Sequence, residues 1–207
     1  MADHPEILAA RRLLRSQHSA ALATLSSRLD GHPFATAVDY LTDHTGRPIF
    51  LISTLAEHAR NITADPRVSL LIQGNASEAQ ASPRLTLTGK ASRIGDEQHA
   101  DLQQRYLRYF PETEPYFELD FFFCRIEPGQ LRYIGGFGAA RWIAPGDFTV
   151  SANGWQEAEN ALMPQHANLI GLDCDGYDLR RNKKIMRVDF TAPVADPSQA
   201  VIKNPAP

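Results

Sequence analysis

In segment 33–72, strand and helix patterns follow one another with such short connections that few folds can accommodate the segment. Residues 34–41 alternate with a period close to two, which predicts a strand with one buried face. The unbroken apolar run 48–52 predicts a strand covered on both faces. A helix is predicted to end at Asp65-Pro66, because the residue before proline avoids the α region, and a third strand follows at 67–72. The segment therefore indicates a meander of strands with one inserted helix.

The start of the inserted helix is the first candidate binding feature. Thr54 and Glu57 have the spacing of a capping box, so the helix is predicted to begin there. Backbone N–H groups at a helix start attract anions. His58 and Asn61 share a polar face of the same helix. The pattern fits an anion site, but it also fits an ordinary capped helix whose polar face lies in solvent, and spacing alone favours the second interpretation.

The N-terminal helix, predicted over 5–18, combines an apolar stripe with a basic face of Arg11, Arg12 and Arg15. Basic faces one or two turns long are common on soluble helices. We therefore interpret these arginines as a solvated surface rather than as a phosphate site. The following strand, 19–26, consists mainly of small residues, which would fill a tight barrel interior or allow a flat cofactor to approach.

Asp120 interrupts the very apolar strand predicted at 117–126, where an ionised carboxylate would be costly to bury. It either faces solvent at the strand start or pairs with a cation or an imidazole, and the residues alone favour neither alternative. A turn at 127–129 and a strand at 130–134 then lead to Gly135-Gly136-Phe137-Gly138. Its glycines permit close approach to a ligand, although a bend at a barrel corner explains them as well.

The chain changes character near residue 145. The remaining segment predicts a helix, an Asp-Gly hairpin and a third strand, which together form a small α+β unit. We therefore divide the chain into 1–145 and 146–207. The elements predicted in the second part are the helix 157–169, which contains His166, the hairpin 172–179 and the strand 185–190.

Composition limits the partners and the location that we expect. A chain of 207 residues can form one good-sized core, or one core with a small appendix. The net charge of -3 gives no electrostatic reason to expect nucleic acid or an anionic membrane surface. No apolar run approaches the ~20 residues of a spanning helix, and the N-terminus lacks the apolar core of a secretory signal, so we expect a cytoplasmic protein. Cys124 and Cys174 are interpreted as buried thiols.

Several of these motifs together resemble a known group. Pro33-Phe34-Ala35-Thr36, Ile52-Ser53-Thr54-Leu55, His58-x-x-Asn61 and Asp65-Pro66 are similar to the signature block of the FMN-binding split-barrel superfamily, the group of pyridoxamine 5′-phosphate oxidase. Asp120, the glycine-rich turn and the C-terminal hairpin resemble its haem-utilisation (HugZ-like) branch in particular. The resemblance implies an α+β fold: an antiparallel six-stranded split β-barrel with flanking helices, plus a small C-terminal α+β domain. It also implies a homodimer with the cofactor at its interface.

The resemblance further implies roles for individual residues. His166 would be an axial ligand of haem iron, and Asp120 of the neighbouring protomer would hydrogen-bond that imidazole and raise its basicity. Haem would be bound and degraded oxidatively, with release of iron. Taken alone, His166 fits a surface or domain-contact histidine better than a ligand. The residues with implied cofactor contacts are Phe34, Thr36, Ser53, Thr54, Leu55, His58, Asn61, Gly136 and Phe137.

Two other functions stay open. In the oxidases of the superfamily an Arg and a Lys bind the flavin phosphate, and Thr36 and His58 occupy those positions here. An FMN-dependent oxidoreductase would then depend on hydroxyls, the helix start and a titratable imidazole, and true pyridoxamine-phosphate oxidase activity is not expected. A non-catalytic protein that sequesters or delivers a cofactor is the other alternative, because no residue pair has a spacing that compels catalysis.

Overall fold

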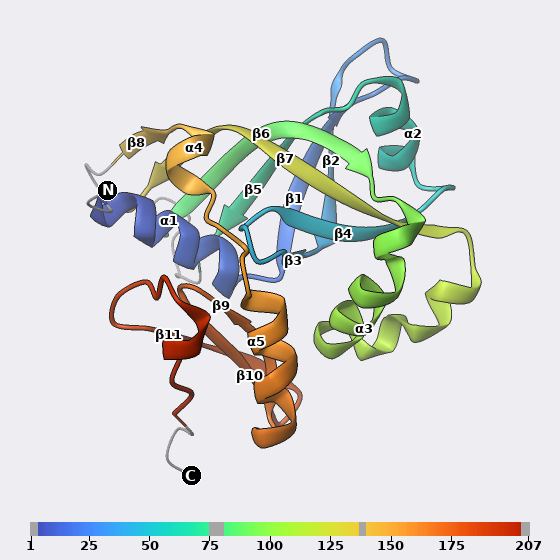
Figure 1. Ribbon diagram of the computed structural model, residues 1–207. Coiled ribbons are helices and arrows are strands. Elements are labelled where there is room, and N and C mark those ends of the chain that lie inside the picture. Colours follow the sequence, from blue (N-terminus) through green and yellow to red (C-terminus); the bar gives the residue numbers. More distant parts are fainter. Residues whose placement is uncertain (1–3, 75–80, 137–139, 204–207) are drawn as a thin grey trace.

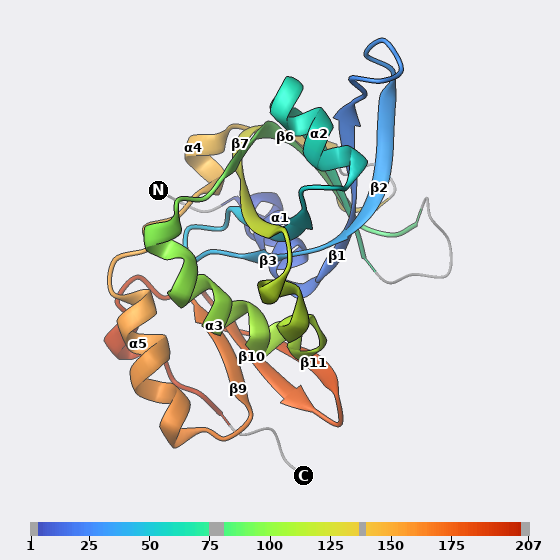
Figure 2. The same cartoon turned by 90° about the vertical axis from the view of Figure 1, so that its right-hand side faces the viewer.

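The structure, a computed structural model, describes residues 4–74, 81–136 and 140–203. Its main element is one antiparallel sheet that curls around its own core (Figures 1 and 2). The strands are β1 (Ser19–Leu25), β2 (Pro33–Asp39), β3 (Leu41–Thr42), β4 (Pro48–Ser53), β5 (Arg67–Gln73), β6 (Arg84–Arg93), β7 (Phe121–Ile134) and β8 (Ala140–Ile143). Their order is β2-β1-β5-β6-β7-β4-β3, and β8 pairs with β7.

Helices flank this sheet on several sides. The α-helices of the described residues are α1 (Pro5–Ser16), α2 (Glu57–Ala64), α3 (His99–Tyr109), α4 (Pro145–Phe148) and α5 (Trp155–Leu162). Short 3-10 segments complete them: η1 (Asp96–Gln98), η2 (Pro111–Glu118), η3 (Met163–Gln165) and η4 (Pro197–Gln199). Helix α2 packs against β1, and α1 and α3 lie between the barrel and a second, smaller sheet.

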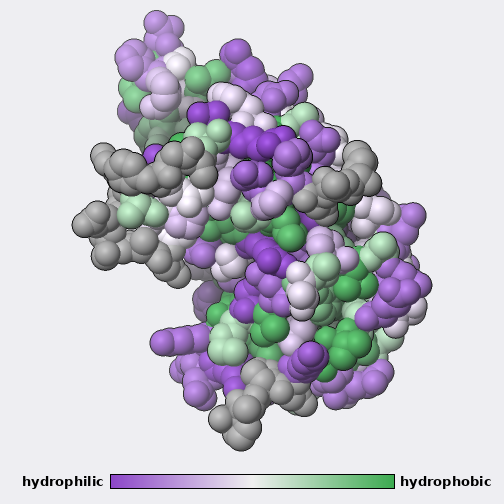
Figure 3. Space-filling model, turned by 90° about the vertical axis from the view of Figure 1, so that its left-hand side faces the viewer, coloured by the Kyte–Doolittle hydropathy of each residue, from purple (hydrophilic) through white to green (hydrophobic). Residues whose placement is uncertain are grey.

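The second sheet contains β9 (Leu169–Asp173), β10 (Gly176–Arg181) and β11 (Lys184–Asp189) in the order β11-β10-β9. Together with α5 it forms a unit below the barrel in Figure 1. Apolar side chains gather on the lower half of the face shown in Figure 3, over this unit. Phe148 packs in the barrel cluster and Trp155 in the C-terminal cluster, close to the division expected at 145/146. That these parts are separate domains stays a prediction.

The apolar core explains why β4 is an unbroken apolar run. Phe50 and Ile52 point into the cluster inside the barrel. Ile49 and Leu51, on the opposite face, pack in a second cluster that includes Tyr106 of α3. Because both faces of β4 are covered, its sequence does not alternate between apolar and polar residues, as predicted.

The predicted α+β fold is confirmed. The six long strands β1, β2, β4, β5, β6 and β7 correspond to the expected six-stranded barrel, and β3 and β8 are short additions to it. In the described residues, no helix is long and apolar enough to cross a membrane.

Two local predictions are wrong. The inserted helix begins at Glu57 with Ala56 as its N-cap and without a side-chain cap, so Thr54 does not start it. The expected turn at 127–129 is absent, and β7 continues through it as one strand with a register shift opposite Gly89. A β-carbon at Gly89 would lie 2.3 Å from the carbonyl oxygen of Glu127, so glycine allows the two strands to stay paired there.

The prediction of a solvated basic face on α1 is also wrong. Arg11 and Arg15 are each only 3% exposed and point into the C-terminal unit. Arg11 Nη2 lies 2.9 Å from Asp175 Oδ1, and Arg15 Nη1 lies 2.8 Å from Asp173 Oδ2. The partner carboxylates are more than 150 positions away in the chain, so helical periodicity alone could not reveal these ion pairs.

Candidate functional site

A cleft lies where β2, β4, the start of α2 and the η2–β7 junction meet. It has a volume of about 230 Å³, and its lining combines aliphatic and aromatic side chains with the polar residues Asp39, Ser53, His58 and Thr113. The rings of Tyr116 and Phe121 stack in its wall, with centroids 4.7 Å apart and planes 13° apart. Parallel stacking leaves a flat aromatic face, and such a face suits a planar ligand.

His58 is the polar centre of the cleft. Its Nδ1 atom lies 3.2 Å from Thr36 Oγ1 on β2. Its Nε2 atom is buried and has no hydrogen-bond partner among the described residues. Burial lowers the pKa of His58, so the neutral imidazole is favoured at neutral pH. A neutral imidazole with one free nitrogen can accept or donate a hydrogen bond to a ligand, or bind a metal.

The turn between β4 and α2 brings further predicted residues to the rim of the cleft. Leu55 is 71% exposed, and its N–H donates to Ser53 Oγ at 3.1 Å. The N–H of Thr54 donates to the carbonyl oxygen of Asp120 at 2.8 Å, which fixes Asp120 beside this turn. Glu57 occupies the first turn of α2. Because its carboxylate already lies at the positive end of that helix, the helix start is a poorer anion site than the sequence suggested.

The structure decides whether the side chains of Asp120 and Asn61 face solvent, a question that the sequence left open. Asp120 is exposed immediately before β7, so it faces solvent at the strand start. Asn61 is fully buried: its Oδ1 accepts from the backbone N–H of Ser27 at 3.0 Å, and its Nδ2 donates to Thr24 Oγ1 at 2.9 Å. The interpretation of Asn61 as a solvated residue is therefore wrong, because its side chain fastens α2 to the strand β1 and the turn after it.

The remaining predicted residues lie apart from the cleft. Gly136, with φ at +122°, follows the opposite end of β7, and Phe137 lies outside the described residues. His166 does not belong to a helix, because α5 ends at Leu162 and η3 ends one residue before His166. The end of α5 and helix α2 lie at opposite ends of the molecule in Figures 1 and 2. One chain thus brings together Thr36, Ser53, Thr54, Leu55, His58 and Asp120, with Phe34 half-buried on β2 nearby, but not His166 or Gly136.

The sequence did not indicate the aromatic wall of the cleft. Segment 111–115 is acidic and contains two prolines, yet η2 runs through it to Glu118 and places Tyr116 against Phe121. The aromatic residues after Pro115 are the available signal in the sequence, but the stacking of Tyr116 on Phe121 follows only from the fold.

The curled antiparallel sheet, the inserted helix and the cleft beside the β4–α2 turn define a split-barrel protein. The family model described as "CREG, beta-barrel" matches residues 3–152. The chain belongs to this family of β-barrel proteins, and the predicted haem-utilisation branch of the split-barrel superfamily is confirmed.

Three relatives are informative. The chain is 32% identical over 157 residues to "Non-canonical heme oxygenase HOZ, chloroplastic" of Arabidopsis thaliana, with 76% of this chain aligned. That alignment spans only 48% of the plant protein. "Heme oxygenase HutZ" of Vibrio cholerae is 29% identical over 150 residues, which are 69% of this chain and 82% of that protein. The structure of a haem-binding protein from Mycobacterium smegmatis superposes with a TM-score of 0.65 and 26% identity, covering 96% of this chain and 94% of that one.

Proposed function

We propose that this protein binds haem at the interface between two copies of the chain and degrades it oxidatively. The observation that carries the proposal is the cleft beside α2. Its His58 nitrogen has no partner among the described residues, its wall is a stacked aromatic pair, and its rim holds the exposed Asp120. The similarity to proteins named as haem oxygenases supports the same ligand.

The position of His166 supports a site made from two chains. His166 is half-buried, and its Nδ1 atom has no hydrogen bond in the described part of the chain. Since it lies far from the cleft of its own chain, only the copy of His166 in a second chain is a candidate for that cleft. There, neutral imidazole would hold haem iron, and Asp120 at the rim would orient the imidazole. Bound haem would supply the oxygen chemistry, and the chain would supply the pocket and the orientation.

One face of the barrel sheet has the properties of a contact surface. A row of directly paired residues crosses six strands, and its side chains share the outer face and are exposed or half-buried. Leu71 and Trp142 in this row are 39% and 62% exposed. The row is mostly small or apolar, which favours close packing of a second copy. Its members are Ala37, Ala21, Leu71, Thr86, Arg132 and Trp142.

Leu71→Arg is expected to convert a dimer into a monomer, because it places a charge in the middle of this row, where no partner would compensate it. The measurement is sedimentation velocity at micromolar concentration. Leu29→Arg is the matched control: Leu29 is 52% exposed on the turn between β1 and β2, and its variant should remain dimeric. A monomeric wild type, or a dimeric Leu71→Arg variant, contradicts the proposed interface.

Haemin titration tests the ligand assignment. Wild-type protein is expected to give a Soret band, and His166→Ala should shift that band and weaken binding by well over tenfold. Asp120→Asn should weaken it less, by about tenfold, in line with the loss of a partner behind a metal-bound histidine. His32→Ala is the control, because His32 is exposed on the β1–β2 turn. If His58→Ala changes the spectrum and His166→Ala does not, the ligand is His58.

A flavin is the second candidate ligand. Ser53 and His58 line the cleft, and Thr36 Oγ1 lies 3.2 Å from His58 Nδ1. Hydroxyl and imidazole groups of this kind can hydrogen-bond a phosphate. A yellow protein as isolated, with colour that weakens in His58→Ala, would favour an FMN-dependent oxidoreductase. Absence of binding to haemin and FMN alike would favour a structural role.

A further inference from the structure

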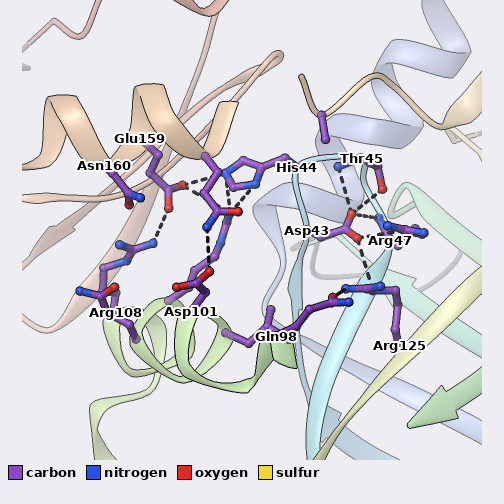
Figure 4. Close-up of a pocket in the computed structure, with 15 residues that line it drawn as sticks. Asp43, His44, Thr45, Arg47, Gln98, Asp101, Arg108, Arg125, Glu159 and Asn160 are labelled. Carbon is purple, nitrogen blue, oxygen red and sulfur yellow. Dashed lines mark hydrogen bonds and ion pairs between the residues drawn. The ribbon is translucent and has the colours of Figure 1, made fainter. Parts of the chain in front are cut away.

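A second, more enclosed cavity lies on the other side of α3, at the junction of the barrel and the C-terminal unit (Figure 4). We call it the junction cavity, and its volume is about 210 Å³. Asp43, Arg47 and Arg125 line its barrel side, and Arg108 and Glu159 line the side of α3 and α5. At about 30 Å³ per water molecule, the space corresponds to about seven waters, which is enough for a small polyatomic ion.

Three carboxylates line the cavity. Asp101 is exposed and accepts from Gln156 Nε2 at 3.3 Å, whereas Asp43 and Glu159 each have several partners. Asp43 Oδ1 accepts from two backbone N–H groups and from Thr45 Oγ1, and its Oδ2 accepts from Arg47 Nε at 2.9 Å. Burial alone would raise the pKa of Asp43, but these bonds hold it below its usual value. Glu159 contacts Arg105, Arg108 and the backbone N–H of Leu172. Burial opposes its charge, yet Arg105 and its other partners lower the pKa of Glu159 to about 2.

The unmatched hydrogen-bonding capacity of the wall consists of donors. The Nε–H groups of Arg105, Arg108 and Arg125 are buried and have no acceptor within hydrogen-bonding geometry among the described residues. The nearest carboxylate to Arg125 Nε is Asp43 Oδ2, at 3.5 Å. Arg105 is only 9% exposed, so water compensates it little. Burial also lowers the pKa of Arg108 and of Arg125, so nearby negative charge only partly offsets the loss of water around them. Burial acts in the same direction on Arg105, but Glu159 and its other neighbours hold the pKa of Arg105 above its usual value.

We propose that the junction cavity binds a small oxyanion, either phosphate or the carboxylate of a small organic acid. Such an ion offers acceptors only, which is what three buried guanidinium N–H donors lack. It also fits the volume of the cavity. The ion would be held by donors from α3 and β7, at the place where these elements face the C-terminal unit. This site is separate from the cleft beside α2 and does not depend on the proposed haem function.

Thermal unfolding of the wild-type protein is the first test. Inorganic phosphate, acetate and succinate are titrated separately, with sodium chloride at matched ionic strength as the reference. A ligand that binds the folded state alone raises the melting temperature with saturating dose dependence. Saturation with phosphate identifies the phosphate class, and saturation with a carboxylate alone identifies the organic-acid class. No saturable rise with any of the three overturns the proposal.

Variants then locate the ion. Arg125→Gln removes one of the three donors and is expected to raise the apparent dissociation constant about tenfold or more, since hydrogen bonds to charged groups are the strong ones. Arg141→Gln is the matched control: it removes a 39% exposed arginine outside the cavity and should leave binding unchanged. Gln104 is exposed at the rim, so Gln104→Glu disturbs no buried group and should weaken binding about threefold. Equal binding by all the variants would mean adventitious association and would overturn the site.

Discussion

Asp173→Asn is expected to destabilise the protein by about 3–5 kcal/mol, the usual cost of removing one partner from a buried ion pair. Asp173 is 3% exposed, accepts hydrogen bonds from Arg187 and forms an ion pair with Arg15. Arg15 Nη1 lies 2.8 Å from it, and Arg187 holds both of its oxygens at 2.7 Å. The amide keeps the size of the side chain but leaves two buried guanidinium groups short of a counter-charge. Urea unfolding at pH 7 measures the change.

Asp189→Asn is the matched control for this variant. Asp189 also contacts Arg187, at 3.2 Å, but its side chain is 35% exposed. Water can therefore compensate much of the loss, and the expected change is below about 1 kcal/mol. If both variants lose similar small amounts of stability, the buried ion pairs do not hold the C-terminal unit in place.

The second large effect is a loss of stability in mild acid that depends on His18. Burial and the nearby charges of Arg187 and Arg180 lower the pKa of His18 to about 4, and only the backbone of Tyr40 opposes them. The unfolded chain takes up this proton near pH 6.5. The contribution of neutral His18 to the stability of the folded state is therefore complete above pH 6.5 and is lost as the pH falls toward 4. The difference of about 2.5 units corresponds to about 3 kcal/mol.

His18→Phe separates this contribution from those of other groups. Burial raises the pKa of Asp178 to about 6, which changes stability in the opposite direction over an overlapping range. Comparing wild type with variant at pH 7.0, 5.5 and 4.5 cancels that contribution. Phenylalanine should fit, because the imidazole already packs against Tyr109 and Phe110, with ring centroids 5.2 and 6.5 Å away. Stability curves that run parallel for the two proteins would refute the assignment, and His32→Phe should follow wild type.

Local patterns predicted the strands and helices well, because their causes lie within a few neighbouring residues. The apolar run of β4 and the proline after Asp65 are examples. The wrong predictions have distant causes. Arg11 and Arg15 looked solvated because their partners, Asp175 and Asp173, are far along the chain.

The candidate site was predictable only in part for the same reason. The block around Thr36 and His58 was recognisable from its motif, and the fold places these two residues together. The aromatic wall and the junction cavity, where three arginine Nε–H groups lack an acceptor among the described residues, depend on segments that meet only after folding. The proposed role of His166 depends on contacts with a second copy of the chain, and the sequence of one chain does not reveal such contacts.

The ion pairs between α1 and the last sheet also have a consequence for synthesis. Arg11 leaves the ribosome early, whereas its partner Asp175 is added 164 positions later. Until then the barrel strands can already pair, but the nascent helix carries guanidinium groups that only water can solvate. Contacts of such sequence separation form late and slowly. The pairing of α1 with the last sheet therefore has to wait for Asp173 and Asp175, and a chain truncated before Asp173 would leave Arg11 and Arg15 without these carboxylates.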